Sequence, residues 1–357
     1  MNTKKINVLI LMCQIETFQG LQNLYHYFKS NDIFNVNIIH YDMVLRTRRR
    51  WIHNIKASDE LKKKNIEFIQ YRGGGLQYLN PDYVFYATPY NIQYPKSLNI
   101  SKVKAYSKIC YFGYGYNIWD CRFKALRFIQ NVDFHFMENE LYYNDFFKHL
   151  EKNRKKISIF RKHSFITGHP KVSSIKFKEE LKYINFGWTP RWDPKTSTFE
   201  LYFDFLTQYF NKNENINLSC RFHPLDKNIS RKTFLKNIEK NKNINIHNQL
   251  YYDKYFENLD VLISDLSTMI AEFFPTGKPI IFCNSSNIGL GSFGNEILKG
   301  MYIVNNKKEM ADTIEDLQNN IDPLKETRKK LIERFYKLYD PLKNISKILI
   351  SDYNQKK

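Results

Sequence analysis

The 357-residue sequence lacks the features that mark several large protein classes. Its five cysteines are scattered without CxxC spacing, and the single CxxH, Cys220–His223, has no second such pair. This predicts buried thiols in a reducing cytoplasm rather than a disulfide framework or a zinc site. No apolar run approaches the roughly 18–20 residues of a membrane-spanning helix. The N-terminal apolar run, Val8–Cys13, is short and has no small-residue cleavage site, which favours a first β-strand over a signal peptide.

Common catalytic motifs are also missing. The sequence contains no Walker A, HExxH or GxSxG motif, and its glycine triplet, Gly73–Gly75, lacks the GxGxxG frame. No Asp-x-Asp pair is present to chelate a metal-bound nucleotide. We therefore expect no metal and no cofactor, and a metal-independent transfer reaction stays open.

Positive charge is abundant. Lysine and arginine number 55 against 36 acidic residues, a net charge of +19, which attracts nucleic acid, anionic lipid or phosphorylated substrates. Arginines gather at Arg46–Trp51, and Lys325–Lys337 reads as a basic amphipathic helix. A merely solvated lysine-rich surface explains part of the excess. We predict a cytoplasmic protein that can attach peripherally to the anionic inner face of the cell membrane.

Strand and helix patterns alternate along the chain. Apolar runs such as 7–12, 36–41, 83–87 and 261–264 alternate with amphipathic stretches, which indicates parallel sheets covered by helices. The alternation is interrupted by a charged stretch near residues 148–162 and then restarts. We predict an α/β protein with domains at 1–165 and 166–322, followed by a helical segment at 323–357.

Small oxygen-bearing residues cluster where one predicted strand hands over to a helix. Ser264 and Asp265 end the strand, and Ser267 and Thr268 precede the helix, where free backbone N–H groups and hydroxyls suit a phosphate. Glu272 lies one turn further and could accept hydrogen bonds from a ribose. The alternative is an ordinary helix N-cap, in which the same residue types are favoured.

A second polar group ends the predicted strand 216–220. Arg221 and His223 project to one side by period-two alternation, and Pro224 stops the strand. Such a pair can hold a pyrophosphate, because the guanidinium supplies charge and the imidazole can protonate a leaving oxygen. The alternative is a capping histidine beside a surface arginine.

Two aromatic segments also follow predicted strands. Trp188–Trp192 comes after residues 183–186, and Gly113–Asn117 comes after 109–112. The glycines of the second segment permit close backbone approach, and its tyrosines offer hydroxyls and ring faces.

In this order and spacing, the motifs resemble the CDP-glycerol glycerophosphotransferases of teichoic acid and capsule synthesis, over roughly residues 70–285. The motifs that carry the resemblance are Arg221-x-His223-Pro224, Ser264-Asp265-x-Ser267-Thr268-x-x-x-Glu272, Gly277-Lys278-Pro279, Thr167-Gly168-His169-Pro170-Lys171 and Thr189-Pro190-Arg191-Trp192, with Asn80–Phe85, Thr88–Asn91 and Tyr111–Ile118 in the N-terminal half. The family carries His-Gly where this sequence has Tyr114-Gly115.

The resemblance implies a GT-B fold, in which two Rossmann-like domains face each other across a cleft. The N-terminal domain would bind the acceptor and the C-terminal domain a nucleotide-activated, CDP-linked donor. The implied donor-binding residues are Ser264, Asp265, Ser267, Thr268, Glu272, Arg191 and His169, and those on the acceptor side are Tyr90, Tyr114, Gly115 and Tyr116.

We therefore predict a transferase of bacterial surface-polysaccharide assembly with a polysaccharide or lipid-linked acceptor. Arg221 and His223 would stabilise charge on the departing phosphate, and Glu16 and Asp120 are the candidate bases. Tyr114 in place of the family's histidine favours sugar transfer, with true glycerol or ribitol phosphate transfer as the alternative. A basic nucleic-acid-binding protein is the non-enzyme alternative, although no nucleic-acid-binding signature supports it and we expect no such partner. An inactive scaffold of a capsule complex is a further alternative.

Overall fold

The computed structural model describes residues 4–41, 56–119, 126–153, 157–177, 184–194, 196–223, 238, 241–247, 253–284 and 289–355. The chain divides into two compact units. Unit 1 comprises Met1–Tyr116, Cys121–Ser174 and Tyr339–Lys357, and unit 2 comprises Asn117–Asp120 and Ile175–Leu338. The division near residue 174 lies a few residues after the expected 165. The expected helical segment 323–357 is shared between the units.

Unit 1 is built on a seven-stranded sheet with the order β3-β2-β1-β4-β5-β6-β7, and every described pairing in it is parallel. The strands predicted in this half of the sequence are confirmed, whereas β6 and β7 were not expected. The strands are β1 (Ile6–Met12), β2 (Phe34–His40), β3 (Phe68–Gln70), β4 (Tyr83–Tyr86), β5 (Lys108–Tyr111), β6 (Phe134–Met137) and β7 (Ser164–Ile166).

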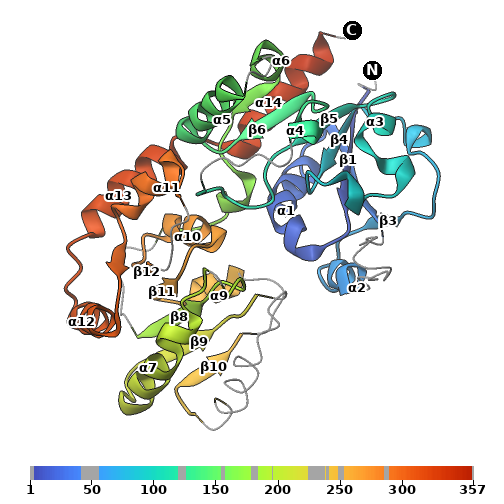
Figure 1. Ribbon diagram of the computed structural model, residues 1–357. Helices are drawn as coiled ribbons and strands as arrows, with labels where there is room; N and C mark the ends of the chain where they lie inside the picture. The colour runs from blue at the N-terminus through green and yellow to red at the C-terminus, as the bar shows by residue number, and fades with distance from the viewer. Residues whose placement is uncertain are drawn as a thin grey trace. The chain divides into compact units, whose positions relative to one another are not determined.

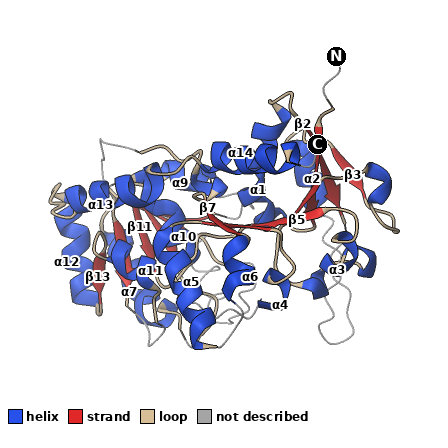
Figure 2. Cartoon of the chain, turned by 90° about the horizontal axis from the view of Figure 1, so that it is seen from above, coloured by secondary structure: helices blue, strands red, loops and turns tan. Residues whose placement is uncertain are grey.

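Helices cover both faces of this sheet, because each parallel crossover returns the chain over one face. Figure 2 shows α1 and α14 on one side of the sheet and α3 and α4 on the other. The helices of unit 1 are α1 (Ile15–Lys29), α2 (Lys56–Lys63), α3 (Ile100–Val103), α4 (Leu126–Ile129), α5 (Glu140–Lys152), α6 (Ile157–Lys162) and α14 (Pro341–Asn354), with short 3-10 turns η1 (Gln77–Leu79), η2 (Asn91–Gln93), η3 (Lys96–Leu98) and η4 (Pro170–Val172).

The last helix, α14, belongs to unit 1 although it follows unit 2 in the sequence (red in Figure 1). The buried hydroxyl of Tyr83, in β4, donates to the main-chain oxygen of Leu349 at 3.0 Å and to the carboxylate of Asp352 at 2.6 Å. Lys108, in β5, forms an ion pair with the same carboxylate at 2.5 Å. These side-chain bonds fix α14 to the centre of the first sheet.

Unit 2 is built on a six-stranded sheet with the order β10-β9-β8-β11-β12-β13, again with parallel pairings. Its core includes Trp188, which is completely buried and stacks on Phe199 with ring centroids 5.3 Å apart. The strands are β8 (Asn185–Thr189), β9 (Asn217–Cys220), β10 (Ile244–Ile246), β11 (Val261–Ser264), β12 (Ile280–Cys283) and β13 (Tyr302–Val304). The helices are α7 (Phe199–Lys212), α9 (Asp253–Asn258), α10 (Thr268–Phe273), α11 (Ser292–Leu298), α12 (Lys307–Gln318) and α13 (Lys325–Ile332), with the 3-10 turn η5 (Phe274–Thr276) and the π-helical turn η6 (Glu333–Lys337).

The basic amphipathic helix predicted at Lys325–Lys337 forms as α13 and the turn after it. Its inner face is part of unit 2: Arg328 is completely buried, donates to the main-chain oxygen of Gly277 at 3.0 Å and pairs with Asp322. Leu331 and Ile332 are buried as well. The apolar face of this helix is therefore already packed, and lysines remain on its outer face.

None of the helices in the described ranges is both long enough and apolar enough to cross a bilayer. Arg46–Trp51, the other basic focus of the sequence, lies outside the described residues.

Candidate functional site

Each sheet has a point at which the strand order reverses. In unit 2 the reversal lies between β8 and β11, which pair directly, with Thr189 opposite Ser264. The chain leaves β8 toward β9 on one side and leaves β11 toward β12 on the other. Open α/β sheets bind ligands outside the carboxyl ends of the strands at such a point. Predicted site residues from two motifs far apart in the sequence therefore meet at one switch point.

Ser264 and Asp265 are completely buried there and tie the two loops together. The Ser264 hydroxyl accepts a hydrogen bond from the Thr189 hydroxyl at 2.8 Å and donates to the Thr189 main-chain oxygen at 3.1 Å. The Asp265 carboxylate accepts from the main-chain N–H of Arg191 at 3.0 Å, and from the N–H and hydroxyl of Thr198 at 2.6 and 2.9 Å. Both residues thus shape the loop after β8, a role that the sequence did not predict for them.

The environment of Asp265 opposes its negative charge. Burial raises the pKa of this carboxyl, and the hydrogen bonds from Thr198 and Arg191 lower it in part. A carboxyl that accepts these bonds in a buried place has an obligatory structural task, because losing it would leave buried N–H groups without partners.

Arg191 links three segments of unit 2. Its guanidinium donates to the main-chain oxygen of Leu266 at 2.8 Å and lies over the ring of Trp119 at 4.7 Å. Trp119 in turn forms a β-bridge with Leu290. Trp119, in the short segment that interrupts unit 1 in the sequence, is thereby fixed to the switch point of unit 2.

Ser267 and Thr268 begin α10 and are partly exposed. The Ser267 hydroxyl accepts from the main-chain N–H of Met269 at 3.3 Å, so it acts as the helix N-cap. Glu272, predicted to lie near a ribose, is 1% exposed at the end of this helix. The hydroxyls at 267 and 268, rather than the carboxylate at 272, are the accessible groups of this motif.

The segment after β9 presents its polar residues as the alternation predicted. Phe222 packs against Trp188 and Phe199, with ring centroids 6.2 and 5.9 Å away. Arg221 is partly exposed and His223 is exposed. The ring of His223 lies 6.0 Å from that of Trp192, which is 42% exposed. Trp192 was not among the predicted site residues, although it belongs to the motif Thr189-Pro190-Arg191-Trp192.

In unit 1, His169 is buried and both of its ring nitrogens are engaged. Its Nδ1 accepts from the Lys171 N–H at 3.1 Å, so Nε2 carries the proton and donates to the Gly113 oxygen at 2.7 Å. Burial lowers the pKa of His169 to about 3. His169 was predicted to bind the nucleotide-activated donor. In the structure its side chain instead links the segment after β7 to Gly113, in the loop after β5.

The position before His169 requires a glycine. Gly168 adopts a φ of +81°, and a Cβ there would come within 2.8 Å of Tyr339, at the point where the chain re-enters unit 1 toward α14. A side chain at this position would both strain the backbone and block the returning chain.

The acceptor-side tyrosines differ in exposure. Tyr116 is buried, with its ring 5.6 Å from that of His169 and its hydroxyl 3.4 Å from the donor amide of Asn139. Burial raises its pKa. Tyr114 and Tyr90 are 43% and 40% exposed. Two of the three tyrosines named from the sequence can therefore contact a ligand, and the third supports the loop.

The candidate bases are only partly described. Asp120 lies outside the described residues, as does the side chain of Glu16, whose backbone is in the first turn of α1. The structure adds Glu138, a buried carboxylate at the end of β6. Its Oε1 lies 3.3 Å from the position that a Cβ at Gly113 would occupy. Glu138 was not among the predicted residues, because β6 was not predicted as a strand.

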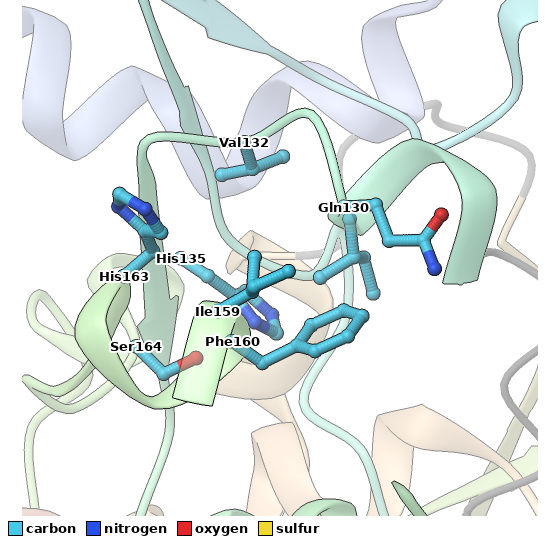
Figure 3. A pocket seen from close by; sticks show the side chains of 8 residues that line it. Gln130, Val132, His135, Ile159, Phe160, His163 and Ser164 are labelled. Carbon is cyan, nitrogen blue, oxygen red and sulfur yellow. The ribbon is translucent and has the colours of Figure 1, made fainter. Parts of the chain in front are cut away.

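The small cavity between β6, β7 and α6 is not a substrate site. Figure 3 shows the side chains of His135, His163 and Phe160 around it. Its volume is about 10 Å³, room for a single water molecule. Burial lowers the pKa of His135 to about 3. Among the residues that the structure describes, no cluster of three or more His, Cys, Asp or Glu side chains is arranged to hold a metal ion.

Solved structures resemble the whole chain. The wall teichoic acid polymerase TagF with CDPG is 13% identical, with a TM-score of 0.64, and the match covers 99% of this chain and 90% of that one. UDP-GlcNAc 2-epimerase from Neisseria meningitidis bound to UDP-GlcNAc is 10% identical, with a TM-score of 0.63 and coverage of 98% and 100%. MnaA from S. aureus with UDP is 10% identical, with a TM-score of 0.63 and coverage of 98% and 97%. These likenesses confirm the predicted GT-B-like fold with two parallel sheets.

Sequence comparison identifies the family. No curated protein matches the chain. The sequence model of CDP-Glycerol:Poly(glycerophosphate) glycerophosphotransferase matches residues 173–349, which include every unit 2 motif quoted above. The predicted family resemblance is thereby confirmed, and the chain is a transferase of the CDP-glycerol glycerophosphotransferase family.

Proposed function

We propose that this transferase moves a polyol phosphate from a CDP-linked donor to a hydroxyl group of a growing teichoic-acid-type or capsular polysaccharide. The observation that carries the proposal is the family match over residues 173–349, because it spans the switch point of unit 2 and its exposed polar residues. The structural likeness to TagF with CDPG supports a donor of the same kind.

The donor nucleotide is assigned to the switch point of unit 2. Arg221 supplies positive charge for the diphosphate, and His223 supplies a donor that can protonate the leaving oxygen. The hydroxyls of Ser267 and Thr268 add hydrogen bonds to phosphate oxygens. The exposed ring face of Trp192, near His223, offers a stacking surface for the cytosine base.

In this reaction the acceptor hydroxyl oxygen attacks the β-phosphorus of the donor. The bond between that phosphorus and the bridging oxygen breaks, and CMP departs with the electron pair, while the hydroxyl proton passes to a base. Arg221 and His223 stabilise the charge that develops on CMP. The candidate bases are Glu138 and Glu16 of unit 1, together with Asp120, which the division of the chain assigns to unit 2.

Sugar transfer is the second candidate, favoured by Tyr114. This exposed tyrosine stands where the family resemblance places a histidine. In sugar transfer the acceptor oxygen attacks the anomeric carbon, the carbon–oxygen bond to phosphate breaks, and CDP is the leaving group. The two reactions therefore release different nucleotides from a CDP-linked donor.

Attachment to an anionic membrane surface at the cytoplasmic face remains part of the proposal. The apolar side of α13 is packed into unit 2, so any contribution of this helix would rest on its exposed lysines, such as Lys329 and Lys330. Attraction of this kind is electrostatic and weakens as the salt concentration rises.

The released nucleotide decides between the reactions. Incubating the protein with radiolabelled CDP-glycerol, CDP-ribitol, and CDP-, UDP- and CMP-sugars, in the presence of a membrane fraction as acceptor, should give CMP and labelled polymer from a CDP-polyol. Release of CDP from a CDP-sugar supports the second candidate instead. A thermal-shift series with CDP, CMP, UDP and GDP should show the largest stabilisation with a cytidine nucleotide, because a ligand of the folded state raises the melting temperature. No shift with a cytidine nucleotide and no transfer from any CDP-linked donor would overturn the proposal.

A further inference from the structure

Two hollows of similar size open on the surface of unit 1 and share one residue, Tyr106. The first has a volume of about 350 Å³ and the second about 400 Å³. Both lie at the lower end of the range for small-molecule sites. The second, called here the Tyr106 hollow, is lined by Gly75, Gln77, Lys96, Ser97, Lys102 and Tyr106.

The charges of the first hollow are paired within the protein. Lys104 forms an ion pair with Asp133 at 2.9 Å, and Lys108 forms one with Asp352 at 2.5 Å. The Asp82 carboxylate of the same hollow accepts from the main-chain N–H of Asn7 at 2.9 Å. These contacts join the segment after α3 to the residue before β6, β5 to α14, and the residue before β4 to β1, so the first hollow has no excess charge to offer a ligand.

The Tyr106 hollow, in contrast, has an excess of positive charge. Its two charged lining residues, Lys96 and Lys102, are exposed lysines, and no carboxylate lines it. Neither lysine forms an ion pair with any residue in the described part of the chain. Two ammonium groups beside one hollow attract an anion, because each gains energy from a shared counter-charge.

Hydrogen bonds fix the wall of the Tyr106 hollow. The Tyr106 hydroxyl accepts from the main-chain N–H of Leu76 at 3.2 Å. The hydroxyl of Tyr71 donates to the Gly74 oxygen at 2.6 Å and is hydrogen-bonded to the Ser97 hydroxyl. The loop after β3 is thus tied to η3 and to Tyr106. A hollow whose walls are already ordered loses less entropy when a ligand binds.

The remaining lining groups suit a hydroxylated chain. Ser97 and Gln77 supply a hydroxyl and an amide, and the ring of Tyr106 supplies a flat apolar surface on which polyol or sugar carbons can pack. With the two lysines, this combination matches a ligand that alternates phosphate groups with polyol or sugar units.

We propose that the Tyr106 hollow binds a phosphate-bearing segment of an anionic polyol- or sugar-phosphate chain, with Lys96 and Lys102 contacting its phosphates. The identity of that chain as the acceptor rests on the proposed function. Binding itself does not, because it needs neither donor nor turnover.

The test compares two double variants of the full-length protein by titration calorimetry with a synthetic glycerol phosphate hexamer. Lys96→Gln/Lys102→Gln removes the charges of the hollow. Lys29→Gln/Lys104→Gln removes the same charge from other parts of unit 1, where both lysines are ion-paired. We expect affinity to fall at least about tenfold in the first variant and to change less than about twofold in the second. CDP affinity should be unchanged in both.

Equal losses in the two variants would show a general charge effect and overturn the proposal, as would unchanged affinity in the first. A parallel titration with vesicles of equal parts phosphatidylglycerol and phosphatidylcholine separates the lipid source of phosphate. Loss of vesicle binding without loss of hexamer binding in the first variant would make the hollow a lipid-headgroup site and refute the chain assignment. If CDP fails to bind the wild type while the hexamer result holds, the proposed donor is wrong and the hollow stands.

Discussion

At the carboxyl ends of both sheets, a buried polar side chain holds neighbouring loops together through hydrogen bonds, but the side chain is acidic in unit 2 and a neutral imidazole in unit 1. In unit 2 a buried carboxylate, Asp265, ties the loop after β8 to β11. In unit 1 a buried neutral histidine, His169, ties the segment after β7 to Gly113. The groups that reach the surface differ too. In unit 2 they are His223, Trp192 and the partly exposed Arg221, and in unit 1 they are Tyr90 and Tyr114. A cationic edge suits a nucleotide diphosphate, whereas an edge of neutral phenols suits a hydroxylated acceptor.

The comparison teaches that a polar residue after a strand is not evidence of ligand contact by itself. Ser264, Asp265 and His169 satisfy their hydrogen bonds inside their own units, and Arg221 and His223 reach the surface. Burial separates the residues that shape a site from those that can touch a ligand.

Replacing Asp265 should change the free energy of unfolding more than any of the other substitutions. Asp265→Ala leaves the N–H groups of Arg191 and Thr198 without their acceptor, and each buried group without a partner costs ~1–3 kcal/mol. We expect the free energy of unfolding of unit 2 to fall by about 3 kcal/mol, measured by urea unfolding followed by tryptophan fluorescence. Asp204→Ala, at an exposed position on α7, is the control and should change it by less than about 0.5 kcal/mol. An unchanged midpoint with lost CDP affinity would make Asp265 a ligand instead of a tie.

The exposed histidine of unit 2 should affect turnover rather than stability. His223→Ala removes a proton donor and charge stabiliser, so kcat should fall at least ~10²-fold, equivalent to about 2.7 kcal/mol, with an unchanged melting temperature. His247→Ala is the matched control, because His247 follows the neighbouring strand β10 in the same unit and packs against Tyr255. Near-normal turnover in a folded His223→Ala protein would return His223 to the capping interpretation.

Asp265 and His169 should make the stability of their units respond to acid in opposite directions. In unit 1, burial lowers the pKa of His169 and of His135 to about 3, below the unfolded value near 6.5. The contribution of these neutral histidines to the free energy of unfolding is complete above pH 6.5. It is lost as the pH falls toward 3, at ~1.4 kcal/mol per pH unit for each histidine. At pH 5 this amounts to about 2 kcal/mol for each histidine. In unit 2 the pKa of Asp265 is raised, so its effect on stability depends on pH in the opposite direction. The free energy of unfolding gains from Asp265 as the pH falls through its folded-state pKa toward the ordinary value of 3.8.

Hydrogen exchange at pH 7.5 and pH 5, corrected for intrinsic rates, measures this difference by peptide. Protection of β1 and β6 in unit 1 should fall more than that of β8 and β11 in unit 2. His135→Leu should reduce the loss in unit 1 by about half, because one of the two titrating histidines is gone. Equal losses in both units, or an unchanged pH dependence in His135→Leu, would contradict the assignment.

The hydroxyls at the start of α10 should give the smallest effect. A Ser267→Ala/Thr268→Ala variant loses groups that can bind phosphate oxygens, and each such bond is worth ~1.5–3 kcal/mol, so calorimetry should show CDP affinity at least tenfold weaker. Stability should fall by only ~1 kcal/mol, since the lost N-cap bond to Met269 is long, at 3.3 Å. Intact affinity with a lower melting temperature would reduce the pair to a helix cap.

Much of the fold could be predicted because the strands are strongly apolar and follow one another at regular intervals. Residues such as Val8, Ile10 and Leu262 lie in strands where the pattern placed them, and the motifs after β9 and β11 lie at carboxyl ends as expected. The missed strands β6, β7 and β13 have 4, 3 and 3 residues, no fewer than β3, which was predicted. β6 contains the buried His135 and β7 begins at the buried Ser164, so polar residues interrupt the apolar pattern of these two strands.

The two α/β halves, the family and the residues of the predicted donor site could be inferred from the amino-acid sequence, because they depend on local periodicity and on motif spacing. Which of those residues are buried and hold loops together became evident from the packing of the folded chain. The Asp265 carboxylate meets partners 67 and 74 residues away, and Tyr83 meets α14 across 269 residues. No local pattern encodes such pairings, since the exposure of a side chain depends on what the rest of the chain packs against it.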